Sequence, residues 1–146
     1  MKRIAILACL FVAVASGARA ADFRSVQDPA AVLYDAPSKA STPLFVVSRS
    51  YPLEVIVNLE AWVKVRDQTG ALSWIERKAL SERRTVVVTA ASAEARQRPE
   101  EAAPPSFSAI QNVVLDLVEI APNGWLRVRH ADGATGYLRA AQVWGN

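Results

Sequence analysis

The sequence has a single cysteine, a single histidine and, once its N-terminal segment is set aside, no surplus of charge of either sign. Cys9 lies in the apolar N-terminal stretch, so the rest of the chain can form neither a disulfide nor a thiolate site. A lone histidine, His130, without cysteine neighbours does not make a zinc site. We therefore expect no metal and no cofactor, and a fold that is stabilised by burial alone.

Residues 1–20 have the pattern of a secretory signal peptide. Lys2 and Arg3 precede an apolar run from Ile4 to Ala15, and Ala18-Arg19-Ala20 matches the small-x-small cleavage pattern. The run is too short to span a bilayer comfortably, which disfavours the alternative of a retained membrane anchor. We predict a periplasmic or secreted protein that has no contact with the membrane after the signal is removed.

Removing this segment changes the charge balance. It holds three of the 17 basic residues and none of the 14 acidic residues, so 14 of each remain and the formal net charge is zero. A nucleic-acid partner requires a surplus of positive charge to displace counterions from phosphates. The composition therefore argues against nucleic-acid binding.

One stretch of the chain occurs twice. Trp62–Leu80, WVKVRDQTGALSWIERKAL, returns 63 residues later without a gap as Trp125–Val143, WLRVRHADGATGYLRAAQV. A spacing this strict indicates that one small unit was laid down twice. Each copy reads as a hairpin, because two short alternating runs flank a polar turn that contains Gly70 or Gly133.

Further short strands are predicted on either side of the hairpins. Tyr51–Asn58 and Asn112–Ile120 are dense in β-branched residues, and Val86–Thr89 is the most strand-like run. Arg77–Leu80 reads as one helical turn. Residues 90–108 are rich in Ala, Glu, Pro and Ser and read as an exposed loop inside the second repeat.

These elements predict an all-β fold class. No helix of ten or more residues is convincing after the signal, and many short strands with regular turns favour small barrels. We expect a first repeat over residues 21–83 and a second over residues 84–146, each too small to be more than marginally stable by itself. Packing of one repeat against the other would stabilise both.

The repeat resembles the bacterial SH3-like (SH3b) domain. The residues that carry the resemblance are Gly124-Trp125-Leu126-Arg127-Val128 and Gly133–Leu138, with Ala93–Pro99 similar to the segment that precedes the family's long loop. The resemblance implies five or six short strands per copy in a partly open barrel. It also implies an export-side binding module, often for cell-wall peptide or for a protein partner.

A second, shorter resemblance lies in the first repeat. Leu33-Tyr34-Asp35 resembles part of the signature of eukaryotic SH3 domains, and Trp62 follows at a similar distance. The proline and tyrosine expected after the last hairpin strand are absent from Arg77–Leu80. This absence argues against recognition of proline-rich helices.

Period-2 geometry gives each hairpin an inward and an outward face. A tryptophan and two cations share each outward face, where the indole can take a flat apolar group and the cations can take carboxylates. Cell-wall peptides offer both groups. The alternative is that each tryptophan caps the end of its barrel's core, and we expect Trp74 and Tyr137 within the core. The candidate ligand-binding residues are Trp62, Lys64, Arg66, Trp125, Arg127, Arg129, Tyr34 and Tyr51.

The function predicted from these residues is non-catalytic. The sequence has no Gly-x-Ser-x-Gly elbow, phosphate-binding glycine loop or His-Glu-x-x-His. We predict a periplasmic or cell-envelope binding module that recognises peptidoglycan peptides or an envelope protein. One alternative is a structural accessory subunit that packs on a larger partner without a small ligand, with the Trp62 and Trp125 faces buried between the repeats. Another is a small hydrolase, for which we find no cluster of polar residues.

Overall fold

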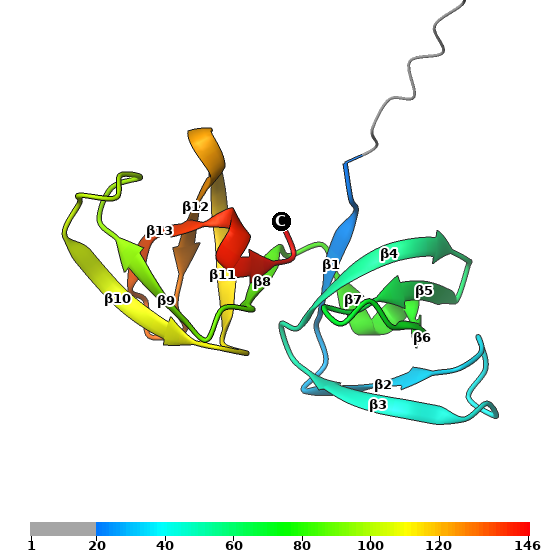
Figure 1. The fold of residues 1–146 in the computed structure, drawn as a ribbon. Helices are drawn as coiled ribbons and strands as arrows, with labels where there is room; N and C mark the ends of the chain where they lie inside the picture. Colours follow the sequence, from blue (N-terminus) through cyan, green and yellow to red (C-terminus); the bar gives the residue numbers. More distant parts are fainter. Residues whose placement is uncertain (1–19) are drawn as a thin grey trace, which may run out of the picture.

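The computed structural model describes residues 20–146, which form two small β-barrels side by side (Figure 1). All but the last residue of the predicted signal peptide lie outside the described residues. Within the described part, no helix has the length and apolar character needed to cross a membrane.

The first barrel is a seven-stranded antiparallel sheet in the order β3-β2-β6-β5-β4-β1-β7. A 3-10 turn, η1 (Arg77–Ala79), lies where the sequence predicts a helical turn. The strands are β1 (Phe23–Val26), β2 (Ala30–Tyr34), β3 (Pro43–Ser48), β4 (Pro52–Asn58), β5 (Trp62–Arg66), β6 (Leu72–Glu76) and β7 (Leu80–Ser81).

The second barrel has the same topology, in the order β10-β9-β13-β12-β11-β8-β14. Its strands are β8 (Thr85–Val88), β9 (Ser92–Arg96), β10 (Pro105–Ile110), β11 (Val114–Ala121), β12 (Trp125–Arg129), β13 (Thr135–Arg139) and β14 (Val143–Trp144), with 3-10 turns η2 (Pro122–Gly124) and η3 (Ala140–Gln142). Even the unusual left-handed residues match, because Ser50 and Asn112 precede equivalent strands and both have a φ of 70°. The predicted pair of tandem all-β barrels is confirmed.

Each barrel encloses its own core of aliphatic side chains. The alternation within each hairpin is as predicted, with Val63, Val65, Leu126 and Val128 all buried. The first core contains Val26, Ala31, Leu33, Leu53, Val63, Val65, Ile75 and Ala79. The second contains Val86, Val88, Ala93, Ala95, Ala109, Leu115, Leu126, Val128, Leu138 and Val143.

The prediction of an exposed loop over residues 90–108 is wrong, because strands β9 and β10 lie in this stretch. Ala93 and Ala95 alternate inward and are buried, although alanine is a weak strand former. The small side chain of Ala95 allows close approach by Gly136, where an added Cβ would lie only 2.8 Å from the Ala95 Cβ. Pro105 begins the edge strand, a position that requires no donated hydrogen bond. Packing therefore overrides local propensity here.

The two barrels contact each other through β1, β4 and β8 and through the C-terminal segment, drawn in red between them in Figure 1. Thr85 and Val87 point away from the second core, yet both are buried. The Phe23 and Trp144 rings pack edge to face with centroids 5.0 Å apart, and the Thr85 hydroxyl donates to the Ser50 carbonyl at 2.6 Å. The repeats do pack together. The accessory-subunit alternative expected this contact to bury the Trp62 and Trp125 faces, whereas the contacts described above involve other residues.

Candidate functional site

Five outward side chains of the first barrel form one surface, which we call the Trp62 face. They come from β2, β5 and β6, three neighbouring strands. Trp62 lies opposite Glu76, and Trp74 lies opposite both Lys64 and Tyr34, so all five point to the same side of the sheet. Each side chain is half-buried, which leaves part of every aromatic ring accessible.

The aromatic rings of the Trp62 face contact one another and a cation. The Tyr34 and Trp62 rings pack edge to face, with centroids 5.6 Å apart and an interplanar angle of 84°. The Lys64 ammonium lies 5.9 Å from the centroid of the Trp74 ring, within the range of a cation–π contact. The face therefore offers apolar ring surface beside a positive charge that is not neutralised by an acid within residues 20–146.

The prediction that Trp74 and Tyr137 lie in the barrel cores is wrong. Ser73 and Ile75 point inward and are buried, so the alternation turns Trp74 outward between them. Gly136 and Leu138 do the same for Tyr137 in the second barrel. Both aromatic rings are half-buried on the outer surface, and Trp74 adds to the Trp62 face a ring that the sequence interpretation had assigned to the core.

The equivalent surface of the second barrel, the Trp125 face, consists of Arg96, Trp125, Arg127, Tyr137 and Arg139. The pairing is the same, since Trp125 lies opposite Arg139, and Tyr137 lies opposite both Arg127 and Arg96. The Arg139 guanidinium carbon lies 4.1 Å from the centroid of the Trp125 ring. Trp125 is only 5% exposed. The prediction of an accessible indole at Trp125 is therefore wrong, because the Arg139 side chain covers the ring.

Arg139 is fixed over Trp125 by two partners. Its guanidinium lies 2.6 and 2.8 Å from one carboxylate oxygen of Glu101, and it donates to the Asn123 carbonyl at 3.0 Å. The loop that carries Glu101 also buries Ala103, whose carbonyl accepts a hydrogen bond from Arg96 at 3.4 Å. The Trp125 face is therefore closed by its own loop.

In the first barrel, the positions equivalent to Glu101 and Arg139 carry side chains of the opposite charge. Lys39 occupies the position of Glu101 and Glu76 that of Arg139, and their charged atoms are 3.4 Å apart. A carboxylate is repelled by the negative face of an indole and cannot stack on it as a guanidinium does. Reversing this ion pair leaves Trp62 open where Trp125 is covered.

The three candidate arginines make contacts with acids or with neighbouring strands. Arg66 pairs with Glu54 at 3.0 Å, and Arg129 lies 3.4 Å from Asp116 at the equivalent position. Arg127 stands between Tyr137 and Glu119 on neighbouring strands. The Arg66–Glu54 and Arg129–Asp116 pairs therefore lie outside the aromatic clusters of the Trp62 and Trp125 faces.

Tyr51 lies away from the Trp62 face, in a groove of about 460 Å³ between the two barrels. Its ring packs against the first core. Burial raises the pKa of its hydroxyl, and the nearby carboxylate of Asp67 raises this pKa further. Gln68 and Asn112 bridge the barrels beside it, with a 3.3 Å hydrogen bond between their side chains.

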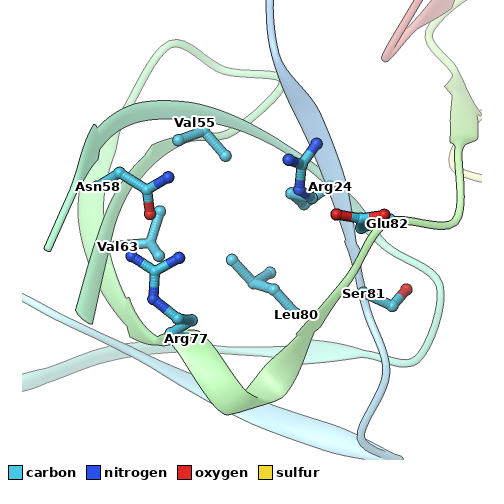
Figure 2. A pocket seen from close by; sticks show the side chains of 8 residues that line it. All are labelled: Arg24, Val55, Asn58, Val63, Arg77, Leu80, Ser81 and Glu82. Atoms are coloured by element: carbon cyan, nitrogen blue, oxygen red, sulfur yellow. The ribbon is translucent and has the colours of Figure 1, made fainter. Parts of the chain in front are cut away.

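A cavity of about 190 Å³ opens at one end of the first barrel, with its side chains arranged in a ring in Figure 2. Two arginines line it, but both have partners. Arg24 donates to Asp22 and to the Phe23 carbonyl, and Arg77 donates to the carbonyls of Leu59 and Glu60. These donors hold the surrounding loops, so the cavity is a weaker ligand site than the Trp62 face.

Metal coordination is not supported by the described part of the chain. Within residues 20–146, no group of three or more His, Cys, Asp or Glu side chains is positioned to hold a metal ion.

Comparisons with solved structures identify proteins with low similarity to this chain. They include NlpC2 from Trichomonas vaginalis (14% identity, TM-score 0.40, 87% of this chain and 49% of that one) and NlpC1 from the same organism (12%, 0.41, 96% and 51%). An NlpC/P60 family protein from Bacillus cereus is similar at 16% identity and a TM-score of 0.38, over 84% of this chain and 55% of that one. The chain thus spans about half the length of these structures.

A search of curated proteins found no match. The family model for the bacterial SH3 domain matches the sequence twice, over residues 27–82 and 89–145. These matches cover both barrels and most of the chain. They agree with the doubled topology and with the resemblance found in the sequence, so the chain belongs to the bacterial SH3 domain family.

Proposed function

We propose that this protein is a non-catalytic binding module of the cell envelope, periplasmic or secreted, which holds a peptidoglycan peptide on the Trp62 face. The observation that carries the proposal is the difference between two equivalent surfaces. Trp62 is left open beside Tyr34 and Lys64, whereas Trp125 is covered by Arg139. The predicted signal peptide and the bacterial SH3 family support an exported binding role.

The chemistry of the Trp62 face suits a short peptide with both apolar and acidic groups. The exposed parts of the Tyr34 and Trp62 rings form an apolar, polarisable surface for an aliphatic or flat group. Lys64 supplies a positive charge for a carboxylate at the side of these rings. Peptidoglycan stem peptides carry small aliphatic side chains and free carboxylates, which match the two halves of the face.

The experiment is a pelleting assay with isolated cell-wall sacculi and the chain without its predicted signal peptide. We expect the wild type to pellet, Trp62→Ala and Lys64→Ala to stay largely in the supernatant, and Arg127→Ala to pellet like the wild type. Arg127 is the matched control because it occupies the position of Lys64 in the second barrel. A wild type that stays in the supernatant, or a Trp62→Ala variant that pellets equally, would contradict the proposal.

An envelope protein remains the second candidate ligand, with a different surface in its favour. Leu44, Phe45 and Val46 are exposed on β3, which pairs on one side only, with β2. An apolar edge strand is suited to contact with another protein. This accessory role predicts that Phe45→Glu abolishes association with a purified partner while Trp62→Ala does not. The wall-peptide role predicts that Phe45→Glu still pellets with sacculi.

A further inference from the structure

Three arginines from three separate parts of the chain meet at the junction between the barrels. They line a cavity of about 230 Å³, to which Arg49 comes from the first barrel, Arg83 from the connection and Arg129 from the second barrel. A neighbouring cavity of about 420 Å³ shares Arg49 and Arg83 and adds Ser25 and Ser81. The first of these cavities has walls from both barrels, whereas the second is lined by the first barrel and the connection.

The junction has more positive charge than its own acid requires. Asp116 is the one carboxylate among the residues that line the two cavities. Its two oxygens lie 2.6 and 2.7 Å from one Arg83 nitrogen, and Arg129 lies 3.4 Å away. Arg49 is exposed and has no ion pair within residues 20–146. Three guanidinium groups around one carboxylate leave a formal excess of two positive charges.

The barrel fold does not require this excess of positive charge. In the first barrel Glu54 occupies the position of Asp116, and Arg66 alone pairs with it at 3.0 Å. The cavity beside Glu54 is lined by the acidic Asp22 and contains no arginine. One cross-strand arginine therefore suffices for the acid, and Arg49 and Arg83 are additional.

We infer that the junction binds a doubly charged oxyanion, that is, a phosphoryl group. Guanidinium groups present paired N–H donors that match phosphate oxygens, and a partly enclosed site screens their charge less than open solvent does. A phosphate dianion neutralises the excess of two positive charges, whereas a single carboxylate neutralises only one of them. Ser50, which lines both cavities, can add a hydroxyl donor. This site is separate from the Trp62 face and does not depend on the function proposed for it.

The test is calorimetric titration of the chain without its signal peptide at low salt, with inorganic phosphate, glycerol phosphate and acetate as separate probes. We expect phosphate and glycerol phosphate to bind more tightly than acetate. Arg49→Ala is expected to weaken phosphate binding by about tenfold, the loss of one charge-assisted contact. Arg49 lacks an ion pair in the described residues, so this variant breaks no ion pair there.

Arg98→Ala is the matched control, since Arg98 is an exposed arginine like Arg49 and lies in a loop away from the junction. It is expected to bind phosphate within about twofold of the wild type. Sedimentation with phosphatidylcholine vesicles, with and without phosphatidylglycerol, separates a lipid headgroup from a soluble phosphoryl ligand. Binding to vesicles alone, lost in Arg49→Ala, would assign the site to lipid phosphate. The inference is overturned if no phosphate-bearing probe binds the wild type, or if Arg49→Ala binds as the wild type does.

Discussion

Arg139 lies over the indole of Trp125 with its guanidinium carbon 4.1 Å from the ring centroid, whereas Glu76 stands at the same position beside Trp62. The two barrels share their topology, their hairpin register and the ion pair at this position. The direction of this ion pair differs between the barrels, and with it the exposure of the tryptophan. A duplicated domain thus has one closed and one open copy of the same surface.

The first prediction concerns the cation that covers Trp125. Arg139→Ala removes a cation–π contact and should lower the free energy of unfolding by about 1 kcal/mol, since such contacts contribute roughly 0.5–2 kcal/mol. It should also increase quenching of tryptophan fluorescence by acrylamide, because the Trp125 ring becomes accessible. Arg98→Ala, which removes an exposed arginine of the neighbouring loop, should change neither measurement. Unchanged quenching in Arg139→Ala would mean that the loop, not the cation, covers the ring.

The second prediction concerns the contact between the barrels. Phe23 is buried against Trp144, so Phe23→Ala should lower the free energy of unfolding by about 3–5 kcal/mol, the usual range for truncating a buried phenylalanine. Urea unfolding measures the loss. Phe45→Ala truncates the same side chain where it is 55% exposed and should cost less than about 0.5 kcal/mol. Equal effects of the two substitutions would show that the barrels do not stabilise each other.

The third prediction concerns the close contact between the neighbouring strands β13 and β9. Gly136→Ala places a Cβ 2.8 Å from the Ala95 Cβ and 3.1 Å from the Arg96 carbonyl oxygen. The overpacking should lower the unfolding free energy by about 1–3 kcal/mol. Thr135→Ala, at an exposed position of the same strand, should stay within about 0.5 kcal/mol of the wild type. A Gly136→Ala protein as stable as the wild type would exclude the close packing of β13 on β9.

The fourth prediction concerns Tyr51 at alkaline pH. Burial and the Asp67 carboxylate raise the pKa of the Tyr51 hydroxyl above its ordinary value of 10.0, so the unfolded chain loses this proton first. The stability that Tyr51 contributes is therefore complete below pH 10 and falls as the pH rises through the folded pKa. Tyr51→Phe should reduce the loss of stability between neutral pH and the region above pH 10, as measured by the urea midpoint. The same alkaline loss in both proteins would contradict this assignment.

Much of the fold could be predicted from the sequence because it follows local rules. The alternation in Trp62–Arg66 and its repeat places the valines and Leu126 in the cores, and the positive φ of Gly70 and Gly133 agrees with their turn positions. The same rule, applied to Leu72–Glu76, turns Trp74 outward between two buried residues. The alternation therefore indicates an outward position for Trp74, although the size of its ring favours a core position.

Other features depend on contacts between distant residues and have no local signal. The close approach of Gly136 to Ala95, beside the pairing of β13 with β9, joins residues far apart in the sequence, which composition alone cannot show. The closure of Trp125 requires Glu101 and Arg139, which lie on different elements and meet only in the folded barrel. The arginines of the junction likewise come from separate segments. The difference between the two tryptophan faces could have been suspected only by comparing Glu76 with Arg139 in the aligned repeats.

The most direct test of the account is a titration monitored by the indole N–H signals of the four tryptophans in an NMR spectrum. The ligand would be a soluble stem-peptide fragment of the cell wall, added to the isotope-labelled chain without its predicted signal peptide. We predict that the signals of Trp62 and Trp74 shift while those of Trp125 and Trp144 stay in place. Shifts confined to Trp125 or Trp144, or no shift at any of the four, would contradict binding at the open face of the first barrel.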